Sequence, residues 1–136
     1  MPRLRIEPPD VVAAALERVR RPDPDAGPDP DAGPDPGLDP GPGVGDLRLL
    51  VKHFLAVLSV RAPGRAVEVR VPPYAAAQVI GGTTHTRGTP PAVVETDAAT
   101  WIALASGTLT WAEADAAGRV VASGERSDLS GYLPLT

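Results

Sequence analysis

The chain of 136 residues has no cysteine, only two histidines and few aromatic residues, which make up 4% of it. Without cysteine it can form neither a disulfide framework nor a thiolate metal site, and two histidines argue against a His-rich one. We take the chain to be a single domain, and because aromatic residues are few, its core must consist mainly of Val, Leu, Ile and Ala.

The opening MPRLRIEPPD holds no apolar run long enough for a signal peptide, and the chain has no apolar run of about 18 residues that could span a membrane. We expect a soluble cytoplasmic protein.

The net charge of −4 is unevenly distributed. Residues 22–43 contain six Asp and no basic residue, so this segment carries −6 and the remaining chain carries +2. Residues 44–136 hold eight charges of each sign and are neutral as a whole. Nucleic-acid binding normally needs a concentrated basic face that neutralises phosphates, and this balance gives no reason to expect one. We therefore expect no nucleic-acid partner.

The acidic segment is an internal repeat. PDPDAG stands at residues 22–27 and again at 28–33, and it then decays into PDPGLDPGPG. Proline fixes φ and removes backbone donors, while regularly spaced Asp carboxylates repel one another. These carboxylates could bind Ca²⁺ only if a turn brought six or more oxygens together, whereas an extended chain points them outward. We expect a solvated spacer without a ligand at 22–43, between an N-terminal helix at 1–21 and a domain at 44–136.

A helix is predicted on each side of the spacer. Asp10 can cap a helix over about residues 11–20, which the following proline would end. Asp46 can cap a second helix with a continuous apolar stripe. His53 lies off this stripe, so we expect it to be a solvated surface histidine rather than a functional one. The stripe consists of Leu47, Leu50, Val51, Phe54, Leu55 and Leu58.

The segment after the second helix is predicted to form β-structure. Valines alternate with charged residues over 67–71, which is typical of a half-buried strand. Residues 75–80 and 92–96 are predicted as further strands separated by a polar loop, and residues 119–123 as a fourth. Together with the helices, these strands predict an α+β fold, in which a mainly antiparallel sheet of about four to five strands has its helices packed on one face.

The last third of the chain carries the clearest boundary signals. Asp97 can cap a helix that ends at Gly107, where a left-handed residue is needed. Thr110 and Glu113 have the spacing of a capping box at the start of a second, short helix. Ser127 could cap a last helical turn. That turn would carry Leu129, Tyr132 and Leu133.

This order of elements resembles the sterol carrier protein type 2 fold and specifically its small bacterial branch. The segment that carries the resemblance is ETDAATWIALASGTLTWAEADAAGRVVASGE. In that family an acidic N-cap, a Trp or Leu in the helix, a glycine stop, a second helix and a G-[KR]-[VI]-x-x-x-G strand follow in this order. The segment VEVRVPPYAAAQVIGGTTHTRGTPPAVVETD is also similar, so the resemblance covers roughly residues 46–135. The Pro-Asp repeat departs from the family pattern. The matching residues are Asp97, Trp101, Gly107, Trp111, Gly118, Arg119, Val120 and Gly124.

The resemblance implies an apolar tunnel or groove between sheet and helices that takes a lipid, a fatty acyl chain or a sterol. Small helices rich in Ala and Gly can leave such a gap, although each side chain around it could equally be an ordinary core residue. Related folds also serve as accessory lobes of bacterial enzymes. The alternative is therefore a structural or protein-interaction module with no ligand of its own, and a protein partner or a homodimer stays open. The implied apolar contacts are Phe54, Leu58, Trp101, Leu104, Leu109, Trp111 and Leu133.

One polar group of residues could orient a ligand. His85 and Arg87 stand in the loop sequence HTRG, where the guanidinium could hold a carboxylate or phosphate and the imidazole would make the affinity pH-sensitive. The simpler hypothesis is that both residues brace a long loop, with Arg87 paired to Glu95 or Asp97. The chain contains no G-x-S-x-G, P-loop, dinucleotide or H-E-x-x-H motif. We therefore expect a non-enzymatic protein without a cofactor or metal.

Overall fold

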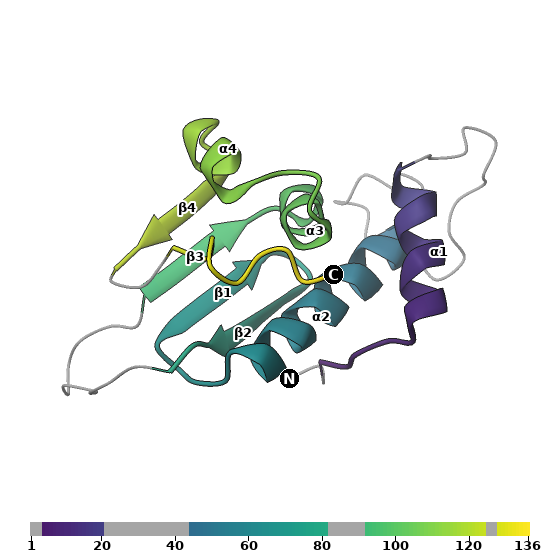
Figure 1. The fold of residues 1–136 in the computed structure, drawn as a ribbon, viewed down its shortest axis with the longest axis horizontal. Helices are drawn as coiled ribbons and strands as arrows, with labels where there is room; N and C mark the ends of the chain where they lie inside the picture. The colour runs from purple at the N-terminus through teal and green to yellow at the C-terminus, as the bar shows by residue number, and fades with distance from the viewer. Residues whose placement is uncertain (1–3, 21–43, 82–91, 125–127) are drawn as a thin grey trace.

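The structure is a computed structural model that describes residues 4–20, 44–81, 92–124 and 128–136. Its elements follow one another as α1 (Pro9–Arg20), α2 (Val44–Arg61), β1 (Val67–Val71), β2 (Ala75–Val79), β3 (Ala92–Thr96), α3 (Ala98–Ser106), α4 (Trp111–Ala116) and β4 (Val120–Ser123) (Figure 1). Some of the predicted features lie outside the described residues. These are the spacer at 22–43, the loop with His85 and Arg87, and the Ser127 cap.

The four strands form one mixed sheet in the order β2-β1-β3-β4. β1 pairs antiparallel with β2 and parallel with β3, and β3 pairs antiparallel with β4. Val67 lies opposite Val79 of β2 and Ala92 of β3, so β2 ends and β3 begins at the same end of the sheet. The structure confirms the predicted α+β fold with a mainly antiparallel sheet.

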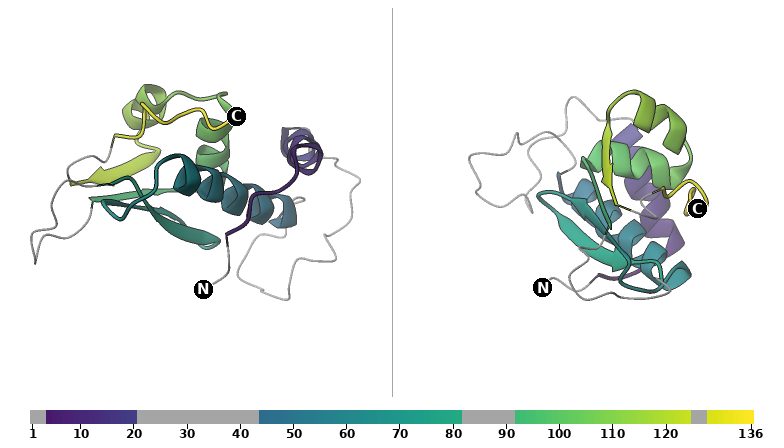
Figure 2. Two further views of the ribbon diagram at one scale, coloured as in Figure 1. Left: turned by 60° about the horizontal axis from the view of Figure 1, so that its bottom comes forward. Right: turned by 90° about the vertical axis from the view of Figure 1, so that its left-hand side faces the viewer.

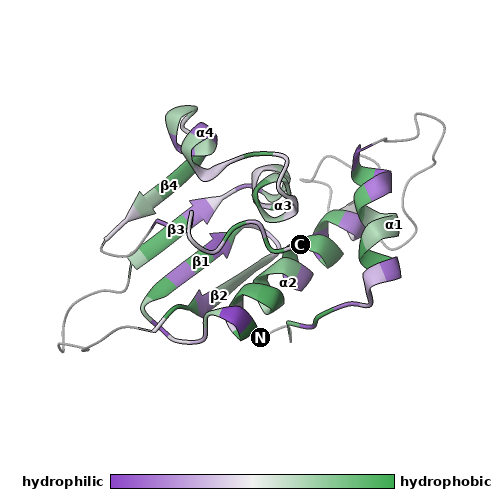
Figure 3. Ribbon diagram, viewed as in Figure 1, coloured by the Kyte–Doolittle hydropathy of each residue, from purple (hydrophilic) through white to green (hydrophobic). Residues whose placement is uncertain are grey.

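One face of the sheet is covered by helices and the other is open to solvent (Figure 2). In β1, the three valines are buried while Glu68 is only partly buried and Arg70 is exposed. This alternation is expected when only one face of a sheet packs against the core. α2 lies against β2 and α3, and α1 packs against α2. Apolar residues are concentrated on α2 and on the strands (Figure 3).

The middle of α2 is buried on all sides. His53, Phe54, Leu55 and Ala56 are consecutive and each is at most 8% exposed. Since successive helical residues point about 100° apart, these four side chains face in every direction around the axis. The prediction of a solvated His53 is wrong, because its Nδ1 accepts a hydrogen bond from the backbone N–H of Glu7 over 3.0 Å. The N-terminal segment and α1 cover the side of α2 that the apolar stripe left polar.

The two predicted caps of α1 and α2 lie inside the helices instead. α1 begins at Pro9, so Asp10 falls in its first turn, and α2 begins at Val44, so Asp46 does likewise. Proline suits the first helical position because the missing N–H would have no partner there. Asp46 instead accepts two hydrogen bonds of 2.9 Å from the Arg18 guanidinium, which raises the pKa of Arg18. This ion pair joins the end of α1 to the start of α2.

α3 forms where it was predicted. The Asp97 carboxylate accepts a hydrogen bond of 2.8 Å from the N–H of Thr100, and Gly107 ends the helix at φ 86°. Trp101 is fully buried, and its indole N–H donates to the Val51 carbonyl over 3.4 Å. A buried Trp normally needs such a partner for its one polar atom. This bond and the packing around it hold α3 on α2.

The C-terminal tail contains no helix within residues 128–136. The N–H of Tyr132 donates to the Leu129 carbonyl in a single turn, and the N–H of Leu135 then donates to the Ala105 carbonyl over 2.8 Å. The predicted last helical turn is therefore wrong. Pro134 has no backbone donor and cannot continue a helix, so the leucine spacing is used to pack an irregular tail against α3.

Candidate ligand-binding site

An apolar pocket lies where the end of α3, the start of α4 and the C-terminal tail meet. Its volume of about 300 Å³ is at the lower end of the range for small-molecule sites. Leu104 is 1% exposed, whereas Leu109, Trp111 and Leu133 are half-buried and present apolar surface to the pocket. The lining residues are Leu104, Gly107, Leu109, Thr110, Trp111, Ala112, Ser130, Leu133 and Pro134.

The turn between α3 and α4 sets the shape of this pocket. Gly107 adopts a left-handed conformation, and the N–H groups of Thr108 and Leu109 then both donate to the Ala103 carbonyl, over 3.0 and 3.2 Å. These bonds reverse the chain sharply, so that Leu109 returns beside the end of α3. A β-carbon at Gly107 would lie 3.5 Å from Pro134, which shows that the tail packs directly on the turn.

The predicted capping box is confirmed at the start of α4. Thr110 Oγ1 accepts the N–H of Glu113 over 3.1 Å, and the Glu113 carboxylate accepts the N–H of Thr110 over 3.1 Å. The Thr110 hydroxyl also donates to this carboxylate over 2.9 Å. The hydrogen bonds from the Thr110 side chain and backbone lower the pKa of Glu113. Because the hydroxyl is fully engaged, it adds little polar character to the pocket.

A family model described as bacterial SCP ortholog matches residues 45–135. The chain belongs to this family. The match begins in the first turn of α2 and ends in the tail, so it includes the whole sheet and every element around the apolar pocket, while α1 precedes it. Membership in the bacterial SCP family confirms the resemblance found in the sequence and supports a sterol-carrier-like role in general. None of the curated proteins compared with the chain matches it.

The seven apolar residues that the SCP resemblance implied as ligand contacts fall into two groups. The first group is at most 1% exposed, belongs to the main core beside the sheet, and lines none of the three pockets described for this SCP domain. The second group lines the apolar pocket. The first consists of Phe54, Leu58 and Trp101. The second consists of Leu104, Leu109, Trp111 and Leu133.

Other residues of the pocket could not be recognised from the SCP pattern as lining residues. Gly107 and Thr110 were identified only as helix boundaries, yet both line the pocket because the two helix ends meet there. Ala112 follows the cap and lies on the same turn of α4. Ser130 and Pro134 carry no sequence signal for this role, since the path of the tail depends on its hydrogen bond to α3.

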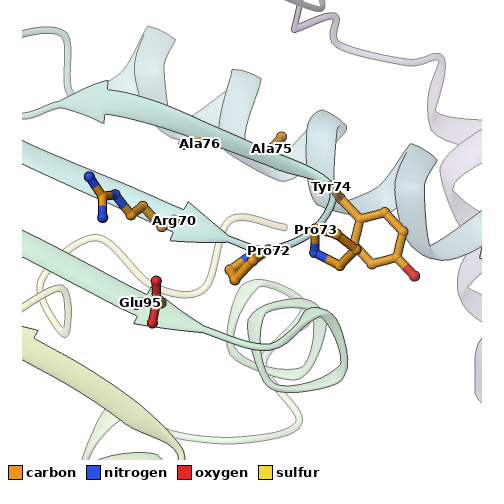
Figure 4. A pocket seen from close by; sticks show the side chains of 7 residues that line it. All are labelled: Arg70, Pro72, Pro73, Tyr74, Ala75, Ala76 and Glu95. Atoms are coloured by element: carbon orange, nitrogen blue, oxygen red, sulfur yellow. The ribbon is translucent and has the colours of Figure 1, made fainter. Parts of the chain in front are cut away.

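A second pocket, of about 420 Å³, lies on the open face of the SCP sheet at the turn between β1 and β2 (Figure 4). Arg70 projects from β1 and Glu95 from β3, and Tyr74 lies at the turn. The Arg70 guanidinium donates to the Glu68 carboxylate over 2.9 Å, which raises the pKa of Arg70. This cation therefore already has a partner, and exposed ion pairs of this kind contribute little energy.

Two further properties bear on what this SCP domain can hold. In the part of the chain that the structure describes, no group of three or more His, Asp or Glu side chains is arranged to bind a metal ion. None of the helices in those same segments combines the length and the apolar character needed to cross a membrane.

Proposed function

We propose that this member of the bacterial SCP family binds an apolar small molecule, of lipid or fatty acyl type, in the pocket between α3, α4 and the tail. One observation carries the proposal. Four residues that the family resemblance implied as ligand contacts come from α3, the turn after it, α4 and the tail, and they line a single pocket. They are Leu104, Leu109, Trp111 and Leu133.

The proposed pocket differs from the expected tunnel between sheet and helices. Phe54 and Trp101 occupy that space as core residues, together with valines of β1. The apolar pocket lies beside a smaller cluster of Leu104, Ala114 and Val120, at the edge of the core. A ligand there would cover half-buried leucine and tryptophan surface, and burial of apolar area stabilises a complex by roughly 25 cal/mol per Å² before the costs of association. The small volume favours one end of an acyl chain over a whole sterol.

We propose binding without catalysis at this site. Among the residues that the structure describes, no Asp, Glu, His, Lys or Arg lines the pocket. Its hydroxyls come from Thr110 and Ser130, and that of Thr110 is bonded to Glu113. A hydroxyl nucleophile needs an adjacent base to become reactive, and the lining residues supply none.

Ligand binding can be tested directly on the full chain. A fluorescent fatty acid titrated into the protein should bind with a Kd below about 100 μM, and native mass spectrometry of protein purified from its host should reveal a co-purified lipid. Since Trp111 lies at the pocket and Trp101 in the core, ligand should change the emission of Trp111 in a Trp101→Phe variant. If neither a bound lipid nor saturable fatty acid binding is found, the carrier proposal is wrong.

The alternative is a protein-interaction module, and the open sheet face favours it. Val121 is 66% exposed on β4, beside Glu95 of β3, on the face of the sheet that none of the described helices covers. A protein partner that docks on this face would bury Val121. Co-purification of a partner that is lost in a Val121→Lys variant, with no fatty acid binding, would support this function instead.

A further inference from the structure

A third pocket, of about 700 Å³, lies where the N-terminal segment crosses the first half of α2. Figure 2 shows this segment passing over α2 on its way to α1. The pocket shares no lining residue with the apolar pocket, so it forms a separate site. Its lining residues are Leu4, Arg5, Glu7, Gly45, Arg48, Leu49 and Lys52.

The pocket carries an excess of positive charge. Arg5 pairs with Glu7, with 3.2 Å between the guanidinium Nε and a carboxylate oxygen, so these two charges offset each other. Arg48 and Lys52 remain, and neither side chain forms an ion pair or hydrogen bond with any of the described residues. They stand four residues apart on α2, where like charges repel and destabilise the helix. A bound anion would relieve this repulsion.

Apolar surface adjoins these two cations. Leu4 and Leu49 line the same pocket and are both only half-buried. Leu49 follows Arg48 directly on α2, while Leu4 comes from the segment that crosses the helix. The pocket thus combines a cationic side with an apolar side, which suits a ligand that has a charged head and an apolar chain.

The N-terminal segment is fixed in place, so the pocket exists before any ligand binds. The backbone N–H of Glu7 donates to His53 in the middle of α2, and the Glu7 side chain is only 16% exposed. Gly45 places the pocket at the first turn of α2, where the positive end of the helix dipole also favours an anion. A preformed site loses less conformational entropy when it binds its ligand.

We infer that this pocket binds the head group of a single-chain anionic amphiphile, a carboxylate or a phosphate monoester. The Arg48 guanidinium is suited to a two-point contact with the head group, and the Lys52 ammonium supplies a second charge. The first carbons of the chain lie against Leu4 and Leu49. This site is independent of the apolar pocket and stands whether or not that pocket binds a ligand.

The test is an NMR titration of the full chain with decanoate, decanol, decyl phosphate and inorganic phosphate. Backbone amides of residues 45–52 report on this pocket, and those of 107–112 report separately on the apolar pocket. We expect decanoate and decyl phosphate to shift the amides of 45–52 at concentrations at least about tenfold lower than decanol or inorganic phosphate. The head group and the chain should thus both be required.

Matched variants assign the effect to the two cations. Arg48→Gln and Lys52→Gln should each weaken decanoate binding at residues 45–52, and the double variant by about tenfold, because each removes a charge-assisted contact. Arg65→Gln removes an equal charge from an exposed position outside the pocket and should change nothing. Arg48 and Arg65 are exposed and Lys52 is half-buried, and none of the three belongs to the buried core.

Several results would overturn the inference. It fails if decanoate does not perturb residues 45–52, or if Arg65→Gln weakens binding as much as Lys52→Gln. It also fails if inorganic phosphate binds as well as decyl phosphate, since the apolar side would then have no role. As a last measurement, the protein is tested for binding to vesicles of mixed phosphatidylcholine and phosphatidylglycerol. If they bind in a Lys52-dependent manner while monomeric decanoate does not, the surface recognises membranes instead of a free amphiphile.

Discussion

The backbone N–H of Glu7 donates a hydrogen bond to Nδ1 of His53, although 46 residues separate the two in the sequence. Nδ1 can accept only while it carries no proton, so the bond requires a neutral imidazole with its proton on Nε2. Burial lowers the pKa of His53, and the nearby Glu7 charge offsets part of this effect. The contact that holds the N-terminal segment on α2 therefore depends on the protonation state of one histidine.

We expect the protein to lose stability as the pH falls through the histidine range. The unfolded chain takes up a proton on this histidine at about pH 6.5, while folded His53 resists it, so the contribution is fully present above about pH 6.5 and declines below it. The loss cannot exceed about 1.4 kcal/mol per pH unit for one group. Urea unfolding midpoints between about pH 5.5 and 7.5 measure it. In a His53→Gln variant, the unfolding midpoint should depend less on pH. If its slope against pH stays the same, another titratable group causes the loss of stability.

A charge placed in the apolar pocket should abolish fatty acid binding. Ala112 and Ala116 are both exposed and lie one turn apart on α4, but only Ala112 lines the pocket. Ala112→Glu would place a carboxylate in an apolar site, which is strongly unfavourable, so affinity should fall at least about tenfold. Ala116→Glu adds the same charge and should bind as the unchanged protein does. The affinity of each variant for a fluorescent fatty acid is measured by titration. If the two affinities are equal, the ligand does not bind in the apolar pocket.

The two tryptophans should respond differently to the same substitution. Trp101→Phe removes a fully buried indole and its hydrogen bond to the Val51 carbonyl, so it should destabilise the protein by about 1–3 kcal/mol. Trp111 is half-buried, and its indole N–H has no hydrogen bond to any described residue, so Trp111→Phe should cost less than about 1 kcal/mol but weaken ligand binding. Chemical denaturation and ligand titration of both variants measure these effects. If only Trp101→Phe weakened ligand binding, the ligand would bind in the core near Trp101 and not in the apolar pocket.

Two glycines with positive φ should differ in how well they tolerate alanine. Gly118, at φ 69°, has no neighbour near the position of an added β-carbon, so Gly118→Ala should cost about 1 kcal/mol for the backbone conformation alone. At Gly64, φ 149°, the β-carbon would overlap the Ile80 carbonyl, so Gly64→Ala should cost on the order of 3 kcal/mol or more. Thermal unfolding of the two variants compares them. Similar losses would mean that the turn around Gly64 can move aside.

The features predicted from the sequence are mostly those that local chemistry determines. The α3 cap at Asp97, the glycine stop and the Thr110–Glu113 capping box each depend on atoms within a few residues, and the structure contains all of them. β1 likewise followed from the alternation of its valines with charged residues. His53 could not be predicted because its environment is created by a segment 46 residues away in the sequence. The same is true of the tail, whose path depends on the carbonyl of Ala105.

The candidate site could be predicted only in part for a related reason. The sequence and the resemblance identify which side chains are apolar and near a helix end. This was enough to select Leu109 and Trp111, which line the apolar pocket. They do not show how completely neighbouring segments fill the space around each side chain. Phe54 and Trp101 have the same apolar character, yet the packing of α2 against α3 and the sheet leaves them inaccessible.

The burial of the middle of α2 has a consequence for how this chain can be shortened. The family match begins at residue 45, which suggests a natural starting point for a shortened protein. Such a fragment would expose to water the surface of α2 that α1 and the N-terminal segment now cover, including the ring of His53. Newly exposed apolar surface along this helix would make the fragment prone to association. We therefore expect a fragment that begins at residue 45 to be less stable than the full chain, because α1 and the N-terminal segment pack against α2 although they precede the family match.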